Sequence, residues 1–237
     1  MQAIILLGGK GTRLQSLYPD RPKALVPIAG RPFIEWQIDW LRRGGVQDFH
    51  LAAGHLAETI ERWAAPQKDY TVTVSREPTP LGTAGGLKFV EPFIRSDPFL
   101  VLNGDSLLPN LVFQSLENFG RNFPTIGKTH SPAGIVVTRI EQAGRYGTVE
   151  FDETSRITAF LEKQDRQNGW VNGGLYVVPL RMLDRIAADR PVSMETDIFP
   201  ELTRQGLVAA IPCPSPLLDM GTPDGIAAME AFLRQQP

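Results

Sequence analysis

A short apolar segment followed at once by a glycine-rich segment opens the chain and limits its fold most. Residues 2–7 predict a buried first strand, and Gly8, Gly9 and Gly11 follow it directly. Glycine lets a backbone turn tightly and approach a ligand without a Cβ in the way. Backbone N–H groups in such a turn, at the start of a following helix, favour phosphate oxygens. The alternative, an ordinary strand-to-helix turn, stays open.

Two basic residues inside this segment favour the phosphate interpretation. Lys10 and Arg13 would bring positive charge to bound phosphates. The segment is not a Walker A loop, because Lys10 is followed by Gly11 rather than by Ser or Thr. It is not the dinucleotide fingerprint either, because Leu14 stands where a further glycine is needed. The segment therefore predicts nucleotide phosphates held in a third way.

Length and composition indicate a globular protein whose expected partners include neither a membrane nor a nucleic acid. The chain has 237 residues, of which 42% are hydrophobic and 21% charged, and its formal net charge is −2. That charge argues against a nucleic-acid partner, since such proteins carry a basic excess. Its one cysteine, Cys213, excludes an internal disulfide. The sequence has no signal-peptide pattern or long apolar run, which predicts a cytoplasmic protein with no membrane partner.

Strands and helices alternate along the first half of the chain. Strands are predicted over 2–7, 48–53, 71–75 and 99–102, with helices over 33–43, 57–63 and from about 83 to before Pro92. In the second half, strands are predicted over 134–140, 147–151, 157–161, 174–178 and 208–211, with helices over 182–188, 195–204 and 223–235. We expect an α/β fold, a Rossmann-like mixed, mostly parallel sheet flanked by helices. Residues 1–237 would form one domain, with a nucleotide-binding half over about 1–123 and a substrate-binding half over about 124–237.

Lys23 lies between two prolines, about ten residues beyond the glycine-rich segment. Pro22 and Pro27 stiffen the backbone, and we expect an extended stretch that returns Lys23 to the bound phosphates. On its own Lys23 would be an exposed lysine in a proline-rich loop. Beside the glycine-rich segment it is better interpreted as a phosphate clamp.

Asp105 follows a predicted strand in the sequence Leu102-Asn103-Gly104-Asp105. In open α/β sheets, ligands bind at the carboxyl ends of the strands. A carboxylate there is a natural ligand for Mg²⁺, which takes oxygen donors and shares them with substrate phosphates. An Asx turn is the alternative interpretation.

Asp219 follows a second apolar stretch near the C-terminus. Thr222 and Pro223 after it are explained by helix initiation, as N-cap and first helical residue. Helix initiation does not explain Asp219. We interpret it as a second carboxylate on the same metal.

Together and in this order, these segments resemble the sugar-phosphate nucleotidyltransferase family, from Ala3 to about Asp224. The motifs are Gly8-Gly9-x-Gly11-Thr12-Arg13-Leu14, Pro22-Lys23, Gly82-Thr83-Ala84, Gly104-Asp105, Tyr146-Gly147, Glu162-Lys163, Asn172-Gly173 and Asp219-x-Gly221-Thr222. Four further stretches, Gly30–Phe33, Leu102–Asp105, Arg145–Val149 and Ser193–Pro200, are most similar to bacterial D-glycero-α-D-manno-heptose 1-phosphate guanylyltransferases. Lys10 and Arg21 depart from that subfamily's pattern, which could alter contacts to phosphate.

The resemblance implies transfer of a guanylyl group from GTP to a heptose 1-phosphate, giving GDP-heptose and pyrophosphate for cell-surface glycans such as capsule, lipopolysaccharide or S-layer. The alternatives are a mannose-1-phosphate guanylyltransferase, a uridylyl- or thymidylyltransferase of the family, and a non-catalytic regulator that binds nucleotide sugars. A bifunctional enzyme with an acyltransferase-like domain is not expected, because only one helix is predicted after Asp224. A homodimer is possible.

The resemblance also implies roles for individual residues. One or two Mg²⁺ ions would bind Asp105 and Asp219, with Arg13, Lys23, Asp105 and Lys163 as the catalytic residues. The nucleotide would contact Leu7, Gly8, Gly9, Lys10, Gly11, Thr12, Arg13, Glu77, Gly82, Thr83 and Asn103. The sugar phosphate would contact Gly147, Glu162, Lys163, Asn172 and Gly173.

Glu77 is interpreted as the residue that selects the base. Guanine presents two adjacent donors, N1–H and the 2-amino group, and one carboxylate can accept from both. Uracil and thymine present a donor beside an acceptor, which suits an amide. In related thymidylyltransferases the residue at the matching position resembles Gln. A buried site built for one donor pattern penalises the other. The alternative is a surface glutamate before a proline turn.

Overall fold

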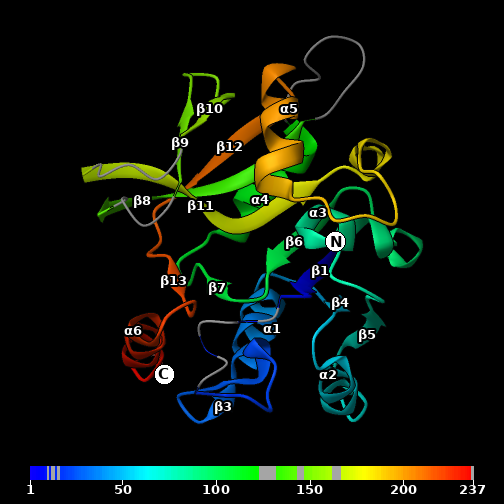
Figure 1. The fold of residues 1–237 in the computed structure, drawn as a ribbon. Coiled ribbons are helices and arrows are strands. Elements are labelled where there is room, and N and C mark those ends of the chain that lie inside the picture. Colours follow the sequence, from blue (N-terminus) through cyan, green and yellow to red (C-terminus); the bar gives the residue numbers. More distant parts are fainter. Residues whose placement is uncertain are drawn as a thin grey trace.

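A mixed nine-stranded sheet crosses the molecule (Figure 1). The computed structural model describes residues 1–9, 11, 14, 17–122, 132–142, 147–161 and 167–235. The strands are β1 Gln2–Leu7, β4 Asp48–Ala53, β5 Thr71–Arg76, β6 Phe99–Asn103, β8 Ala133–Gln142, β9 Thr148–Phe151, β10 Ile157–Leu161, β11 Gln167–Val178 and β12 Val208–Cys213. Their order is β10-β9-β11-β6-β1-β4-β5, and β8 links β11 to β12. The predicted fold class, a mixed and mostly parallel sheet flanked by helices, is confirmed.

The sheet changes character where β6 meets β11. β6, β1, β4 and β5 run parallel to one another, whereas β11 is antiparallel to β6, β8 and β9. Two short antiparallel pairs lie off the sheet, β2 (Pro27–Ile28) with β3 (Arg31–Pro32) and β7 (Ser106–Leu107) with β13 (Leu218–Asp219). The second pair brings a segment near the C-terminus next to the end of β6.

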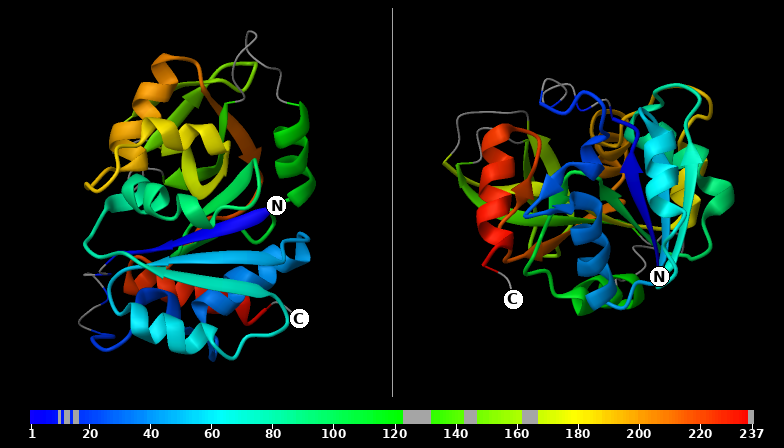
Figure 2. Two further views of the ribbon diagram at one scale, coloured as in Figure 1. Left: turned by 90° about the vertical axis from the view of Figure 1, so that its right-hand side faces the viewer. Right: turned by 90° about the horizontal axis from the view of Figure 1, so that it is seen from below.

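Six α-helices cover the described part of the sheet. They are α1 Phe33–Arg43, α2 Ala57–Ala64, α3 Gly82–Phe89, α4 Phe113–Asn122, α5 Phe199–Arg204 and α6 Pro223–Leu233. Short turns of other helix types span Lys23–Leu25 (η1), Glu91–Phe93 (η2), Leu180–Arg185 (η4) and Met194–Ile198 (η5). In the left view of Figure 2, α1, α2 and α6 lie on one side of β1, β4 and β5, and α3 lies on the other. Among the described residues, no helix has the length and apolar content that a membrane span needs.

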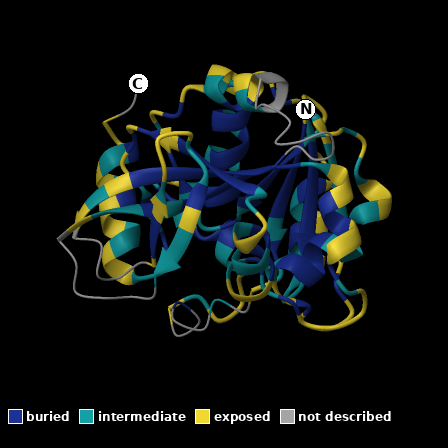
Figure 3. Cartoon of the chain, turned by 90° about the horizontal axis from the view of Figure 1, so that it is seen from above, coloured by how far each residue is buried: buried dark blue, intermediate teal, exposed yellow. Residues whose placement is uncertain are grey.

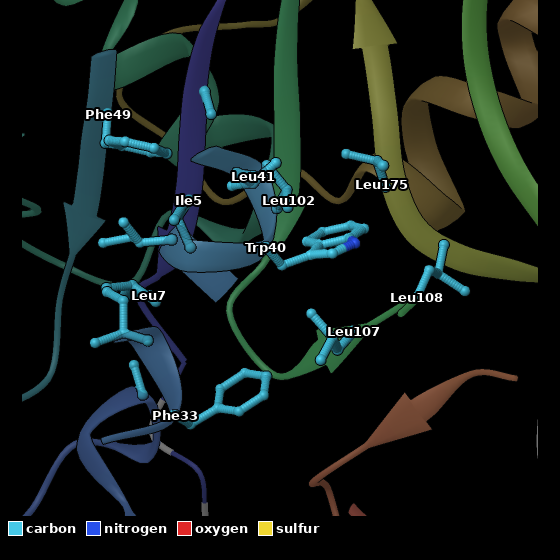
Figure 4. Close-up of a cluster of buried hydrophobic side chains, with 14 of the residues drawn as sticks. Ile5, Leu7, Phe33, Trp40, Leu41, Phe49, Leu102, Leu107, Leu108 and Leu175 are labelled. Atoms are coloured by element: carbon cyan, nitrogen blue, oxygen red, sulfur yellow. The ribbon is translucent and has the colours of Figure 1, made fainter. Parts of the chain in front are cut away.

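Two hydrophobic cores lie on the two faces of the sheet, because successive strand residues point to opposite faces. On β1, Ile5 belongs to the core under α1 and Ile4 to the core under α3. Figure 4 shows the first core, in which Trp40 of α1 points toward Leu107 of β7 and Leu175 of β11. Buried residues accordingly run along the central strands, and exposed ones lie on the outer helix faces (Figure 3).

The structure corrects several predicted elements. The helix predicted over 182–188 is the 3₁₀ turn η4, which ends where Ile186 adopts an extended backbone. The helix predicted over 195–204 is divided into the π-turn η5 and α5, and β11 begins at Gln167 rather than at residue 174. Helix α4 was not predicted. It is held by packing of Phe113 against Trp40, a contact between segments far apart in the sequence.

Candidate functional site

A cavity of about 720 Å³ opens at the carboxyl ends of β1 and β6. This is the edge of a parallel sheet at which ligands bind in α/β proteins. The described residues that line it are Leu6, Leu7, Gly8, Gly9, Gly11, Leu14, Pro22, Lys23, Ala24, Glu77, Pro80, Gly82, Thr83, Asn103, Gly104, Asp105, Asp219 and Gly221. Every described residue that the sequence predicted for the nucleotide or the metal, together with Lys23, therefore lines one cavity.

Three glycines of the glycine-rich segment, Gly8, Gly9 and Gly11, line this cavity beyond the end of β1. Gly11 has a φ of +59°, a left-handed conformation that costs glycine least. A Cβ on Gly9 would meet no heavy atom within 4 Å, so the backbone there is open to a ligand. Lys10, Thr12 and Arg13 lie outside the described residues.

Lys23 and Asp105 form an ion pair in the cavity. Lys23 Nζ lies 2.6 Å from Asp105 Oδ2, and their side chains are 19% and 35% exposed. The expected extended stretch around Lys23 is wrong, since Pro22 is extended but residues 23–25 form the 3₁₀ turn η1. The N–H groups of Leu25 and Val26 donate to the carbonyls of Pro22 and Lys23, and these hydrogen bonds close the turn. The turn directs the Lys23 amine to the end of β6.

Asp219 reaches the same place from the other end of the chain. It pairs with Ser106 between β13 and β7, and the N–H of Met220 donates to the Asp105 carbonyl at 3.0 Å. The Asp219 carboxylate accepts from the N–H of Gly221. Thr222 then caps α6 by accepting from the Gly225 N–H at 3.1 Å, so the predicted helix start is confirmed.

The donor set at this point fits a magnesium ion. Among the described residues there is no group of three or more His, Cys, Asp or Glu side chains of the kind that alone holds a metal. Mg²⁺ is usually held by one or two carboxylates and completes its shell with water and substrate phosphates. Asp105 and Asp219, which both line the cavity, match this requirement.

Glu77 is buried at the wall of the cavity, with 9% of its surface exposed. Burial raises the pKa of its carboxyl, and the Leu81 N–H donates to it at 3.4 Å. A Cβ on Gly8 would lie 2.7 Å from Glu77 Oε1, and one on Gly86 would lie 2.5 Å from it. The carboxylate therefore occupies room that two glycines leave. The alternative interpretation, a surface glutamate, is wrong.

The residues predicted for the sugar phosphate do not line this cavity in the described part of the chain. Gly147 is exposed and precedes β9, while Asn172 and Gly173 lie within β11. The Asn172 amide is already engaged, since Nδ2 donates to the Tyr176 hydroxyl and Oδ1 accepts from the Gly174 N–H, both at 2.9 Å. Glu162 and Lys163 lie outside the described residues.

Some cavity residues carried no predicted role. Gly104 and Gly221 adjoin the two aspartates, and Pro80 lies in the turn after Glu77. A Cβ on Gly104 would lie 2.7 Å from the Leu6 carbonyl oxygen, because the ends of β6 and β1 touch there. The sequence signal that could have identified Gly104 is a glycine next to an aspartate at the end of a predicted strand.

Comparison with known proteins gives the family. The model of a family described as nucleotidyl transferase matches residues 2–236. The chain belongs to this family. The predicted family membership is therefore confirmed.

Relatives of known name add detail. The chain is 34% identical to the mannose-1-phosphate guanylyltransferase catalytic subunit beta of Xenopus tropicalis, over 99% of this chain and 65% of the relative. It is 37% identical to the mannose-1-phosphate guanyltransferase of Neurospora crassa, over 94% of this chain and 61% of the relative. The chain thus spans less than two thirds of these relatives. HddC from Yersinia pseudotuberculosis, complexed with GMP-PN, superposes with a TM-score of 0.84 at 26% identity, covering 98% of this chain and 99% of HddC.

Proposed function

We propose that the chain is a sugar-1-phosphate guanylyltransferase. It transfers GMP from GTP to a sugar 1-phosphate and releases pyrophosphate. The observation that carries the proposal is one cavity lined by the glycine-rich segment, the Lys23–Asp105 pair and Asp219. The names of the relatives from Xenopus tropicalis and Neurospora crassa support it.

In the proposed reaction, the substrate supplies its own nucleophile. An oxygen of the sugar phosphate, already anionic at neutral pH, forms a bond to the α-phosphorus of GTP. The bond between that phosphorus and the α,β-bridging oxygen breaks, and pyrophosphate leaves with the electron pair. No general base is needed, so the protein's task is to align two anions that repel each other and to neutralise their charge.

The cavity residues meet these two needs. Backbone N–H groups of the glycine-rich segment hold phosphate oxygens, and the Lys23 amine faces the α-phosphate or the incoming phosphate. Asp105 and Asp219 would hold the magnesium ion, which lends positive charge to the phosphates when it is bound. Arg13 would hold the β- and γ-phosphates, a role proposed from the family resemblance.

Glu77 supports guanine as the base. Its carboxylate can accept from both adjacent donors of guanine, whereas uracil and thymine offer one donor beside an acceptor. Because Glu77 is buried, an unmatched donor pattern leaves a charged group without partners. HddC, the similar structure of nearly equal length, was solved with GMP-PN, a guanine nucleotide by its name.

The sugar is proposed to have the manno configuration. The subfamily motifs favour D-glycero-α-D-manno-heptose 1-phosphate, and the names of the curated relatives favour mannose 1-phosphate as the second candidate. Both share one ring configuration and differ at the exocyclic carbons. We assign the sugar phosphate to the second half of the chain, over about 124–237, where Gly147, Glu162, Lys163, Asn172 and Gly173 remain the proposed contacts. A cytoplasmic location and a homodimer stay predictions.

A substrate matrix tests the proposal. GTP, ATP, UTP and dTTP are each combined with the 1-phosphates of mannose, glucose and the heptose, in the presence of Mg²⁺, and pyrophosphate release is measured. We expect turnover with GTP and a manno-configured sugar, at least tenfold above every other pair. Highest turnover with UTP or dTTP would overturn the base assignment. No pyrophosphate from any pair would favour the non-catalytic regulator.

A further inference from the structure

The carboxylate of Glu195 connects α3, two residues of which line the cavity, to β11. Glu195 lies in the turn η5 and is not one of the described residues that line the cavity. Its Oε2 accepts from the hydroxyls of Thr83 and Ser193, each at 2.9 Å. Its Oε1 lies 3.5 Å from the hydroxyl of Tyr176 in β11. One side chain thus contacts α3, which borders the predicted nucleotide site, and β11, which carries the predicted sugar contacts.

The backbone around Glu195 is packed tightly against α3. The carbonyl of Val192 accepts from the N–H groups of Ala84 and Gly85 at 2.9 and 3.1 Å. The Thr83 hydroxyl also accepts from the Met194 N–H at 2.8 Å. A Cβ on Gly82 would lie 2.6 Å from the Val192 carbonyl oxygen. These contacts fix where the Glu195 carboxylate can lie.

The Tyr176 hydroxyl has one proton to donate and two lone pairs. Tyr176 is fully buried, so its hydroxyl needs hydrogen-bond partners inside the protein. The Asn172 amide donates to its oxygen at 2.9 Å. Glu195 is the acceptor for its proton. Burial, with the Glu195 carboxylate next in effect, raises the pKa of Tyr176, which keeps the hydroxyl protonated.

This arrangement fixes the orientation of the Asn172 amide. Since the Tyr176 proton goes to Glu195, the lone pairs of the hydroxyl accept only N–H groups, and the amide must turn its Nδ2 toward it. Asn172 Oδ1 then accepts from the Gly174 N–H at 2.9 Å. Tyr176 and the Gly174 N–H therefore hold the two ends of one amide.

The strand β11 is distorted at this point. Its pairing with β8 shifts register between Asn172 and Tyr176, and Gly174 has a φ of +72°. A Cβ on Gly174 would lie 3.1 Å from Asn103 Nδ2. A bulge of this kind redirects a side chain from the regular face of a strand, and here the Asn172 amide meets the Tyr176 hydroxyl across it.

We propose that Glu195 is a positioning residue, which acts through Tyr176 to set the direction of the Asn172 amide for the sugar phosphate. This role rests on the proposed function. Glu195 touches neither substrate. It determines which face of the Asn172 amide, donor or acceptor, is left for the ligand.

Two substitutions separate this role from simple stabilisation. Tyr176→Phe keeps the buried ring and removes only the hydroxyl. The amide oxygen of Glu195→Gln can still accept from Thr83, but its NH₂ group faces the Tyr176 hydroxyl and reverses the donor order. We expect each variant to lower kcat/KM for the sugar 1-phosphate about tenfold, with the KM for GTP changed less than twofold. The double variant should be no worse than either single variant, because both remove one pathway.

Matched controls and an independent measurement complete the test. Glu201→Gln changes a carboxylate of α5 that accepts from Gln205, and Tyr70→Phe removes a hydroxyl that donates to Gln67. Both control variants should leave kcat/KM unchanged. Hydrogen exchange of the Asn172 side-chain NH₂ group, assigned in ¹⁵N–¹H spectra with Asn172→Asp, needs no turnover. We expect at least tenfold faster exchange of this group in Tyr176→Phe and in Glu195→Gln.

The outcomes keep the two proposals apart. If the wild-type protein releases no pyrophosphate, the proposed function fails, and the exchange data alone decide the role of Glu195. Unchanged exchange in Tyr176→Phe overturns the inference. So do additive losses in the double variant, or equal losses toward GTP and sugar phosphate, since these indicate a purely structural role.

Discussion

The two sides of the candidate site assemble their residues in different ways. On the proposed nucleotide side, Gly8, Lys23, Glu77 and Asp105 reach one cavity from the ends of parallel strands or the turns beside them. On the proposed sugar side, Asn172 lies inside the long antiparallel strand β11 and is held by Tyr176. The parallel half therefore positions functional groups by backbone topology, and the antiparallel half does so through a network of side chains.

The difference predicts how each side responds to substitution. A residue at a strand end faces the ligand directly, so its loss should affect chemistry or nucleotide selection and leave the fold intact. A residue in the side-chain network should act through its neighbours, with coupled effects. The five predictions that follow probe this contrast, beginning with the largest effect.

Removal of the Asp105 carboxylate should nearly abolish turnover. Asp105→Ala takes away one of the two proposed metal ligands, and loss of one such electrostatic contact typically lowers kcat about 10²–10³-fold. The side chain is partly exposed and pairs with the side chains of Lys23 and Ser106, so the stability of the fold should change little. Pyrophosphate release and thermal unfolding check this. The matched control is Asp224→Ala, an exposed aspartate in the first turn of α6. Retention of half the wild-type rate in Asp105→Ala would contradict the metal assignment.

Glu77→Gln should weaken the selection of guanine. An amide can accept only one of the two adjacent guanine donors, so kcat/KM for GTP should fall about 10- to 100-fold, with a smaller change for UTP. The ratio of the two kcat/KM values, measured in one buffer, gives the result. An unchanged GTP-over-UTP ratio means that Glu77 does not read the base.

The Glu77 carboxylate should also make GTP binding depend on pH. Burial raises the pKa of Glu77, so protonation begins at a higher pH than for an exposed glutamate. The KM for GTP should therefore rise as the pH falls toward that pKa, and the rise should be absent in Glu77→Gln. Equal pH profiles for the two proteins would count against this role.

His50 should affect stability without affecting the site. It is fully buried in β4, where its ring nitrogens contact the hydroxyls of Thr73 and Ser75, and burial, with Arg95 adding to the effect, lowers the pKa of His50 to about 4. The unfolded chain binds a proton below about pH 6.5 and the folded protein does not, so stability is lost as the pH falls from there toward 4. The loss between pH 7 and pH 5 should be about 2 kcal/mol.

Urea unfolding of the wild-type protein and of His50→Gln at both pH values measures this difference. The variant should lose less stability between the two pH values, because its amide does not titrate. GTP binding at pH 7 should be the same in both proteins, since His50 does not line the cavity. A parallel pH response of the two proteins would show that His50 is not the group responsible.

The cap of α6 should give the smallest effect. Thr222→Ala removes the side-chain acceptor for the Gly225 N–H, and loss of an N-cap typically costs about 1 kcal/mol. Thr222→Ser keeps the acceptor and should restore most of that stability in urea unfolding. If Ser and Ala destabilise the protein equally, the cap is not the cause.

The sequence predicts the parallel half well for a physical reason. A strand, a turn and a helix are each encoded locally, so β1, α1 and β4 follow from apolar spacing, and the residues after β1 and β6 must meet because parallel strand ends share an edge. The burial of Glu77 could not be predicted in this way. It depends on the space left by Gly8 and Gly86, which lie far from each other in the sequence.

The antiparallel half was harder to predict, because its key contacts are not local. The bulge at Gly174 is set by pairing with β8, and the Tyr176 hydroxyl joins β11 to Glu195 of η5. Helix α4 likewise depends on the contact of Phe113 with Trp40. The motif from Ser193 to Pro200 was visible in the sequence, but the contact of Glu195 with Thr83 gives it a physical role only in three dimensions.

Transfer of an isotopic label tests the central claim most directly. The protein is incubated with GTP, Mg²⁺ and a manno-configured sugar 1-phosphate whose non-bridging phosphate oxygens are ¹⁸O, and the products are analysed by mass spectrometry. The account predicts a GDP-sugar that retains all of the label and pyrophosphate that carries none, because the sugar phosphate attacks the α-phosphorus. Label in pyrophosphate, or hydrolysis of GTP without a GDP-sugar, would contradict it.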